Sequence, residues 1–202
     1  LDGAWRVGAQ TVGFTAHDDG GSGLDGGVHY RLNGGVTHET TGSVRVSTPG
    51  ETLVDFWSQD HAGNREETQS ATARIQKVPS LTLSVSASTI TYPGSVRLTG
   101  LLADASGTPV PSRQVILERS FDGVGWFQLS AAVWNGSRYT ATDRPTQKSF
   151  YRMRHVGGGE WANRTSSSRT VYVRAYIGTP AAPSTAYRTR AFATYGTLKP
   201  AH

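Results

Sequence analysis

The chain of 202 residues has a formal net charge of +5 and contains 24 glycines and no cysteine. Without cysteine, disulfide bonds and thiolate metal sites are excluded, and no apolar run approaches the length of a membrane-spanning helix. No window shows the helical period of about 3.6 residues, so little helix is expected.

The charge is unevenly divided along the chain. Residues 1–77 carry six basic and ten acidic side chains, a net charge of −4, which leaves +9 for residues 78–202. The acidic N-terminal part of one copy and the basic C-terminal part of another attract each other when copies of the chain stack in one direction. This division predicts head-to-tail contacts between copies, which propagate into a filament unless they close a ring.

The first part of the chain predicts short strands separated by turns. Residues 11–17 and residues 28–32 both alternate apolar and polar side chains with a period of two, which is typical of strands with one buried face. The sequence Asn-Gly-Gly at 33–35 is a hairpin signal, and it leads into another short strand near residues 36–39.

The most informative stretch is residues 52–64, which predicts a two-faced strand followed by the turn Asp-His-Ala-Gly-Asn. Gly63 and Asn64 tolerate positive φ, and the carboxylate of Asp60 can accept hydrogen bonds from the backbone of its own turn. A closing strand at residues 70–75 completes the pattern of short strands and turns that predicts a β-sandwich.

A second series of alternating segments begins after Pro79. Proline donates no backbone hydrogen bond and restricts the residue before it, so a domain boundary is expected between residues 77 and 78. The expected strands of this second β-sandwich are residues 81–85, 96–102, 115–117, 127–133, 139–142, 150–155 and 169–174.

Residues 5–76 resemble a bacterial immunoglobulin-like module. The turn at 60–64 matches a D-x-A-G-N motif, and the upstream segments 17–23 and 28–35 resemble D-x-G-S-G and Y-x-x-D-G-G motifs, with Asn33 where aspartate is usual. The resemblance implies an immunoglobulin-like β-sandwich.

Residues 80–174 resemble another such repeat, through Y-P-G-S-V at 92–96, V-x-L-x-x-S-x-D-G at 115–123 and F-Y-R-x-R at 150–154. Together the two likenesses indicate tandem bacterial immunoglobulin-like repeats, of the OmpL47 and Big types, which occur in large extracellular or cell-surface proteins. They imply an all-β fold of tandem immunoglobulin-like β-sandwiches and an extracellular or cell-surface location.

The tail repeats the start of the second module at an offset of 96 residues. At this offset Ser184, Thr185, Phe192, Gly196 and Leu198 correspond to Ser88, Thr89, Val96, Gly100 and Leu102. The predicted domains are therefore 1–77, 78–174 and 175–202, the last being the first two strands of an incomplete third module. Two strands cannot bury a core, so Phe192, Tyr195 and Leu198 are candidate partner-binding residues. The expected partners are other copies of the chain or adjacent modules of the same polypeptide.

The first module offers a candidate metal site made of Asp18, Asp19, Asp25 and Asp60. In a sandwich, the loops after residues 16 and 58 emerge at the same end, where their carboxylates can bind Ca²⁺, which takes about six to eight oxygen ligands. The alternative is that Asp18 and Asp60 cap turns through backbone N–H groups. No other cofactor is expected.

The remaining motifs give no signal for catalysis or nucleic-acid binding. There is no nucleophile elbow, no metal-ligand spacing of histidines and no nucleic-acid recognition motif. The sequence thus predicts a non-enzymatic extracellular structural or adhesive protein that forms a stalk or fibre, with no membrane insertion.

The alternative function is an accessory carbohydrate-binding segment of a secreted glycan-degrading enzyme. Such a segment would stack cell-wall or host polysaccharide on exposed aromatic side chains. Trp161, in a glycine-rich loop, is expected to be the most exposed of the tryptophans.

Overall fold

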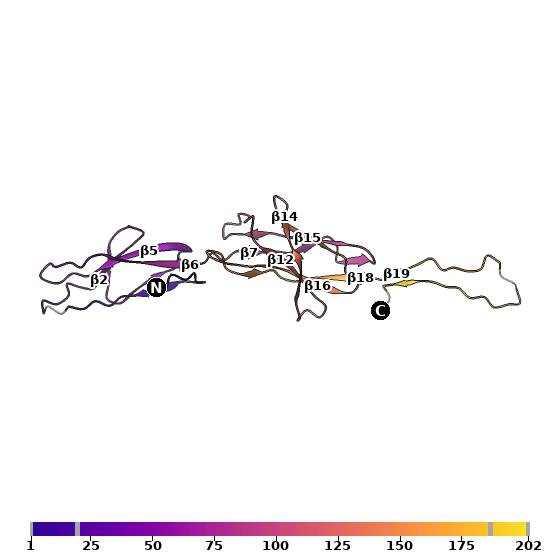
Figure 1. Ribbon diagram of the computed structural model, residues 1–202, viewed down its shortest axis with the longest axis horizontal. Coiled ribbons are helices and arrows are strands. Elements are labelled where there is room, and N and C mark those ends of the chain that lie inside the picture. The colour runs from indigo at the N-terminus through magenta and orange to yellow at the C-terminus, as the bar shows by residue number, and fades with distance from the viewer. Residues whose placement is uncertain (1, 19–20, 186–187, 201–202) are drawn as a thin grey trace. The chain divides into compact units, whose positions relative to one another are not determined.

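The computed structural model describes residues 2–18, 21–185 and 188–200 (Figure 1). Every regular element in these residues is a β-strand, which confirms the predicted all-β fold, and they include no helix that could cross a membrane. The chain divides into two compact units. Unit 1 is Leu1–Val78 with Gly157–Ala162, and unit 2 is Pro79–Val156 with Asn163–His202.

Unit 1 is built from two sheets. Its strands are β1 (Gln10–Gly13), β2 (Val28–Leu32), β3 (His38–Thr40), β4 (Ser43–Val46), β5 (Gly50–Trp57) and β6 (Gln69–Ile75). β1 pairs with β4, and the other sheet has the order β3-β2-β5-β6. The sequence predicts a strand that continues to residue 17, but β1 ends at Gly13. Gly13 lies opposite Ser43, the first residue of β4, so no partner residue of that strand remains for residues 14–17.

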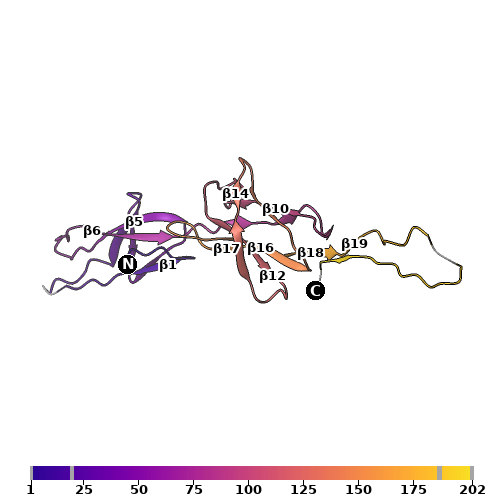
Figure 2. The same ribbon diagram turned by 45° about the vertical axis from the view of Figure 1, so that its right-hand side comes forward.

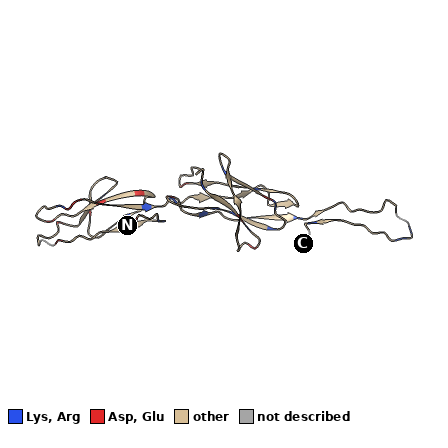
Figure 3. Cartoon of the chain, viewed as in Figure 1, with Lys and Arg blue, Asp and Glu red and all other residues tan. Residues whose placement is uncertain are grey.

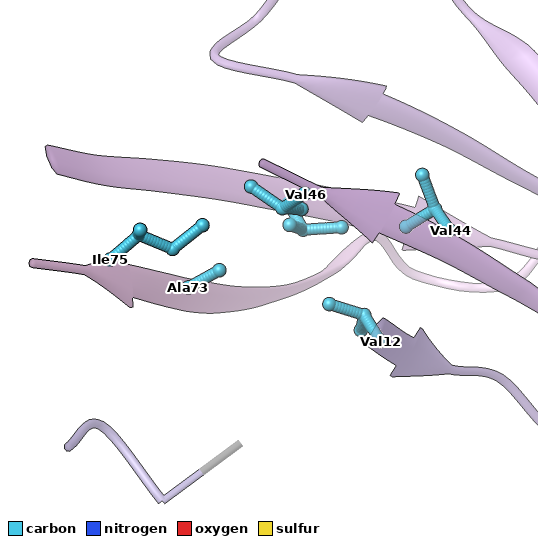
Figure 4. Close-up of a cluster of buried hydrophobic side chains, with 6 residues drawn as sticks. Val12, Val44, Val46, Ala73 and Ile75 are labelled. Carbon is cyan, nitrogen blue, oxygen red and sulfur yellow. The ribbon is translucent and has the colours of Figure 1, made fainter. Parts of the chain in front are cut away.

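The core of unit 1 lies between these sheets. Alternation along the strands turns one set of aliphatic side chains inward, and Figure 4 shows them meeting from both sheets. The buried cluster is Val12, Val44, Val46, Val54, Ala73 and Ile75. Phe14, Tyr30 and Leu32 pack against its border and are partly buried.

Unit 2 contains two larger sheets and two short pairs. Its strands are β7 (Ser80–Leu81), β8 (Ser84–Val85), β9 (Thr89–Thr91), β10 (Val96–Gly100), β11 (Leu102–Ala103), β12 (Val115–Ser120), β13 (Phe127–Ala131), β14 (Val133–Trp134), β15 (Tyr139–Asp143), β16 (Ser149–His155), β17 (Arg164–Thr165), β18 (Arg169–Arg174), β19 (Tyr176–Ile177) and β20 (Leu198–Lys199). The sheet orders are β14-β15-β10-β8 and β13-β12-β16-β18-β9, and β12 lies beside β16 in the second sheet (Figure 2). β7 pairs with β11, and β17 pairs with β16.

Both units have the strand order of an immunoglobulin-like sandwich. In unit 2 the pairs β10–β15 and β12–β16 form the middles of the two sheets, and β9 runs parallel to β18. In unit 1 the pair β1–β4 corresponds to β10–β15, and the pair β2–β5 corresponds to β12–β16. In unit 1 the parallel pair is a bridge between Arg6 and Ile75. The predicted immunoglobulin-like β-sandwich is therefore confirmed.

Unit 2 has a tyrosine at the tyrosine-corner position of such sandwiches, but its hydroxyl donates to a side chain and not to the backbone, and the disulfide is absent. In antibody domains this tyrosine lies two residues before the second cysteine. Here Tyr151 lies two residues before Met153, and its hydroxyl donates to Asp143 Oδ2 at 2.7 Å. Met153 is fully buried against Gly100 of β10, so a thioether facing a glycine occupies the place of the inter-sheet disulfide.

The tail forms a hairpin with a repeated register. β19 and β20 pair with Ile177 opposite Leu198, and β7 and β11 pair with Leu81 opposite Leu102. Adding 96 to the residue numbers of the second pair gives the first. The next hydrogen bond repeats too: Gly178 N donates to Thr197 O at 2.8 Å, as Thr82 N donates to Leu101 O at 3.0 Å.

Candidate functional site

The turn after β5 is organised by the carboxylate of Asp60. Its Oδ1 accepts from Asn64 N at 2.8 Å, and its Oδ2 accepts from Asn64 Nδ2 at 2.7 Å and from Ser22 Oγ at 2.9 Å. Gly63 N donates to Asp60 O at 3.0 Å, and Gly63 has the positive φ, 87°, that its sequence position predicts. The sequence-predicted contact between Asp60 and its own turn is thus present.

Two loops meet at this end of unit 1. The hydroxyl of Ser22, which donates to Asp60, also lies 3.4 Å from Asp18 Oδ2, and Gly23 N donates to the same Asp18 oxygen. Asp25 Oδ1 is 3.6 Å from His61 Nδ1. The structure therefore brings Asp18 and Asp60 to either side of one serine, places Asp25 beside His61, and leaves Asp19 outside the described residues.

A shallow pocket of about 240 Å³ lies among these loops. Its lining includes His17, Asp18, Asp60, Arg65 and Glu66, so carboxylates and cations face it together. Within residues 2–18, 21–185 and 188–200, no three histidine or carboxylate side chains are grouped so that they could hold a metal ion. The contacts of Asp18 and Asp60 are those of turn capping, and calcium at this site stays a prediction.

The hydrogen bonds to Asp60 stabilise its charged form. The side-chain and backbone N–H groups of Asn64, followed by the hydroxyl of Ser22, lower the pKa of Asp60 below its ordinary value of 3.8. Because the folded pKa lies below the unfolded one, the carboxylate stabilises the turn above the unfolded pKa, and this stabilisation is lost as the pH falls through the folded pKa.

We therefore expect the turn at residues 60–64 to persist to a pH below 3.8 and then to open. The chemical shift of the Asn64 amide, followed by NMR from neutral pH to about pH 2, measures this transition. Asp60→Asn is the matched control, because it keeps an oxygen acceptor and removes the titration. A midpoint at or above 3.8 would contradict the capping role. Repeating the titration with calcium in place of EDTA tests the calcium prediction, because a bound cation would lower the same pKa further.

The tryptophans do not form an exposed platform. All five are buried or half-buried. Trp57 lies under the guanidinium groups of Arg65 and Arg31, whose carbons are 4.2 and 5.7 Å from the ring centroid. His29 stacks beside the same ring at 5.8 Å. This arrangement of cations on an aromatic ring does not leave the face of Trp57 free for a sugar.

The expectation that Trp161 is the most exposed tryptophan is wrong, because its side chain is only 7% exposed. The segment Gly157–Ala162 belongs to unit 1. It pairs with Lys77, whose N–H donates to Glu160 O at 2.7 Å and whose carbonyl accepts from Ala162 N at 3.0 Å. The Lys77 ammonium lies 5.6 Å from the Trp161 ring centroid. Paired backbone therefore holds this glycine-rich loop, and the indole is covered.

No protein-family model matches the chain, and no curated protein matches it. Among solved structures, the fibronectin(III)-like modules of Clostridium thermocellum CbhA share 11% identity, with 84% of this chain and 86% of that chain covered and a TM-score of 0.35. Murine CEACAM1b shares 12% identity over 84% and 96% of the two chains, with a TM-score of 0.43. The Escherichia coli adhesin FdeC shares 17% identity over 87% and 63%, with a TM-score of 0.37. Similarities this low say nothing about function.

Proposed function

We propose that the chain is a non-enzymatic, extracellular structural or adhesive segment, in which immunoglobulin-like repeats of the OmpL47 and Big types form a stalk that bears tension. The observation that supports this proposal is a parallel pairing between an early and a late segment of each unit, Arg6 with β6 in unit 1 and β9 with β18 in unit 2. These segments run parallel, so pulling the ends of a unit apart loads the hydrogen bonds between them along the strand direction. Several bonds must then break together, whereas an antiparallel hairpin opens one pair at a time.

Both units have a parallel pair, but the pair in unit 2 is longer than the single bridge in unit 1. In unit 1, Arg6 N donates to Arg74 O at 3.0 Å and Gln76 N donates to Arg6 O at 2.8 Å. In unit 2 the parallel pair covers three residues on each strand, β9 and β18. It is flanked by bonds from Tyr172 N to Ser88 O at 2.8 Å and from Tyr92 N to Arg174 O at 2.9 Å. We therefore expect unit 2 to resist more force than unit 1.

Stretching single molecules of the full chain from its two ends tests the load-bearing role. We expect two unfolding steps, distinguished by their contour lengths at about 3.3–3.6 Å per residue. Tyr172→Pro removes the N–H that donates to Ser88 O and should lower the force of the longer step. Tyr172→Ala is the matched control, because it trims an exposed side chain and keeps that N–H.

Two outcomes would contradict the proposal. One is unfolding of unit 2 at a force that Tyr172→Pro and Tyr172→Ala affect equally. The other is retention of the full chain on insoluble cell-wall polysaccharide, which would favour the accessory carbohydrate-binding segment instead. The covered positions of Trp57 and Trp161 lead us to expect no such retention.

A further inference from the structure

The tail hairpin, described over residues 176–185 and 188–199, carries exposed apolar side chains that unit 2 buries at equivalent positions. The equivalent segment of unit 2, residues 80–103, is its opening hairpin, and the strands that cover it, β12 to β18, are its closing strands. Building on the proposed function, we propose that the tail hairpin is the opening hairpin of an immunoglobulin-like module and binds a set of closing strands. The occupant is a set of strands with the pattern of β12 to β18, supplied without an opening hairpin of its own.

The register of the two hairpins supports this assignment. The pair Ile177–Leu198 and the hydrogen bond from Gly178 N to Thr197 O both match unit 2 at an offset of 96 residues. Farther along, Ala181 pairs with Tyr195, which differs by one residue from the pairing of Val85 with Leu98 in unit 2. The hairpin therefore reproduces the register of unit 2 at its base, at Ile177–Leu198 and Gly178–Thr197, and departs from it by one residue at Ala181–Tyr195.

Burial shows which face is uncovered. Leu81, Leu102 and Val96 are 7%, 0% and 0% exposed in the core of unit 2. Their counterparts Ile177, Leu198 and Phe192 are 71%, 59% and 57% exposed. Large apolar side chains stand at these three positions in both hairpins, whereas Thr179 and Thr194 stand where unit 2 buries Leu83 and Leu98. The tail therefore repeats part of a core face and leaves that part uncovered.

A glycine marks where a closing strand would cross. A Cβ on Gly100 would overlap Met153 Sδ of β16 and lie 2.9 Å from Thr82 O. Its counterpart Gly196 has no atom within 4 Å of such a Cβ. The space that β16 fills with a methionine in unit 2 is thus open over Gly196. We infer that the partner places a comparably bulky apolar side chain there.

The described residues of a second copy offer no uncovered closing strands. In unit 2 these strands already cover Leu81 and Leu102, which are buried. In unit 1 the valines of β1 and β4 are buried against β5 and β6. A second copy would have to open one of its own cores to accept the tail, so a partner without an opening hairpin fits better.

The experiment supplies closing strands of known sequence. The full chain is extended by replacing residues 200–202 with a second copy of residues 104–174, which follow β11 directly in unit 2. If the proposal is correct, amide hydrogen exchange at Gly178 and Tyr195 should slow by roughly 100-fold in the extended chain relative to the 202-residue chain. Unchanged exchange at these amides would overturn the proposal.

Two valine variants make the test specific. In the extended chain, Gly196→Val should abolish the new protection, because its side chain fills the space above the glycine. Ala193→Val should retain the protection, because its counterpart in unit 2 is the exposed Arg97. Equal behaviour of the two variants would contradict the proposed docking face. Amides of unit 2 should exchange alike in all variants, which shows that the rest of the chain remains folded.

Sedimentation of the 202-residue chain tests whether a second copy of the chain binds the tail hairpin. Self-association that Gly196→Val abolishes and Ala193→Val leaves intact would identify a second copy as the partner and overturn the proposal. A monomer that gains tail protection only when extended supports it. Neither result depends on the force at which unit 2 unfolds, so the load-bearing role can fail separately.

Discussion

Replacing Asp143 with alanine is expected to lower the free energy of unfolding of unit 2 by about 3–5 kcal/mol. Asp143 Oδ2 accepts from Arg119 Nη1 at 2.9 Å and from the Tyr151 hydroxyl at 2.7 Å. The Arg119 and Asp143 side chains are 19% and 14% exposed, and Arg119 Nε is buried without a hydrogen-bond partner. Without the carboxylate, a largely buried guanidinium would lose its only ion-pair partner in the described residues.

The measurement is urea unfolding of the full chain, followed by a signal from unit 2. Tyr151→Phe is the control, because it removes one hydrogen bond to Asp143 and leaves the ion pair. Its cost should be about 0.5–1.5 kcal/mol. A loss of less than about 1 kcal/mol for Asp143→Ala would show that water reaches Arg119 in the folded unit.

The Tyr151 hydroxyl remains protonated in this pair. Burial, and after it the hydrogen bond to Asp143, raise the pKa of Tyr151, so the hydroxyl stays a donor throughout the neutral range.

Gly100→Ala is the second substitution with a large expected effect, a destabilisation of unit 2 by about 1–3 kcal/mol. The added Cβ meets Met153 Sδ, which can move, and Thr82 O at 2.9 Å, which belongs to the paired backbone of the opening hairpin. Thermal unfolding measures the loss. Gly196→Ala, the same change at the counterpart position in the tail, should leave the stability unchanged because no atom lies within 4 Å.

A double-mutant cycle separates the two contacts of Gly100. Combining Gly100→Ala with Met153→Ala should cost less than the sum of the two single changes, because the smaller side chain makes room for the new methyl group. Strict additivity would mean that the clash with Thr82 O dominates. A Gly100→Ala variant as stable as the parent would contradict the close approach of β10 and β16.

The strands and turns were predictable because their signals are local. The period of two along residues 52–58 and the turn chemistry of Asp60 and Gly63 lie within one short stretch, and the structure has a strand and a capped turn there. The proximity of Asp18 to Asp60 followed from sandwich connectivity. The role of Ser22 as the donor between them did not, because a hydroxyl in a loop gives no sequence signal of its partner.

Contacts set by strand register could not be predicted. The contact of Arg31 with Trp57, the pairing of the Trp161 loop with Lys77 and the two ion pairs of Glu118 all join residues far apart in the sequence. The contacts of Glu118 show how strand register affects the charge of unit 2. Both of its oxygens accept from arginines, at 2.6 Å from Arg152 and 2.6 Å from Arg154, so part of the basic excess of residues 78–202 is neutralised inside the unit. Figure 3 shows basic and acidic residues on both units.

Met153 carries the only sulfur atom of the chain, which has one methionine and no cysteine. Its side chain is fully buried, with the sulfur atom close to Gly100 of β10. Oxidants can therefore reach it only when unit 2 opens, and the resulting sulfoxide would hinder reclosure. The extent of methionine sulfoxide in the recovered protein would then be a chemical record of how often unit 2 has unfolded.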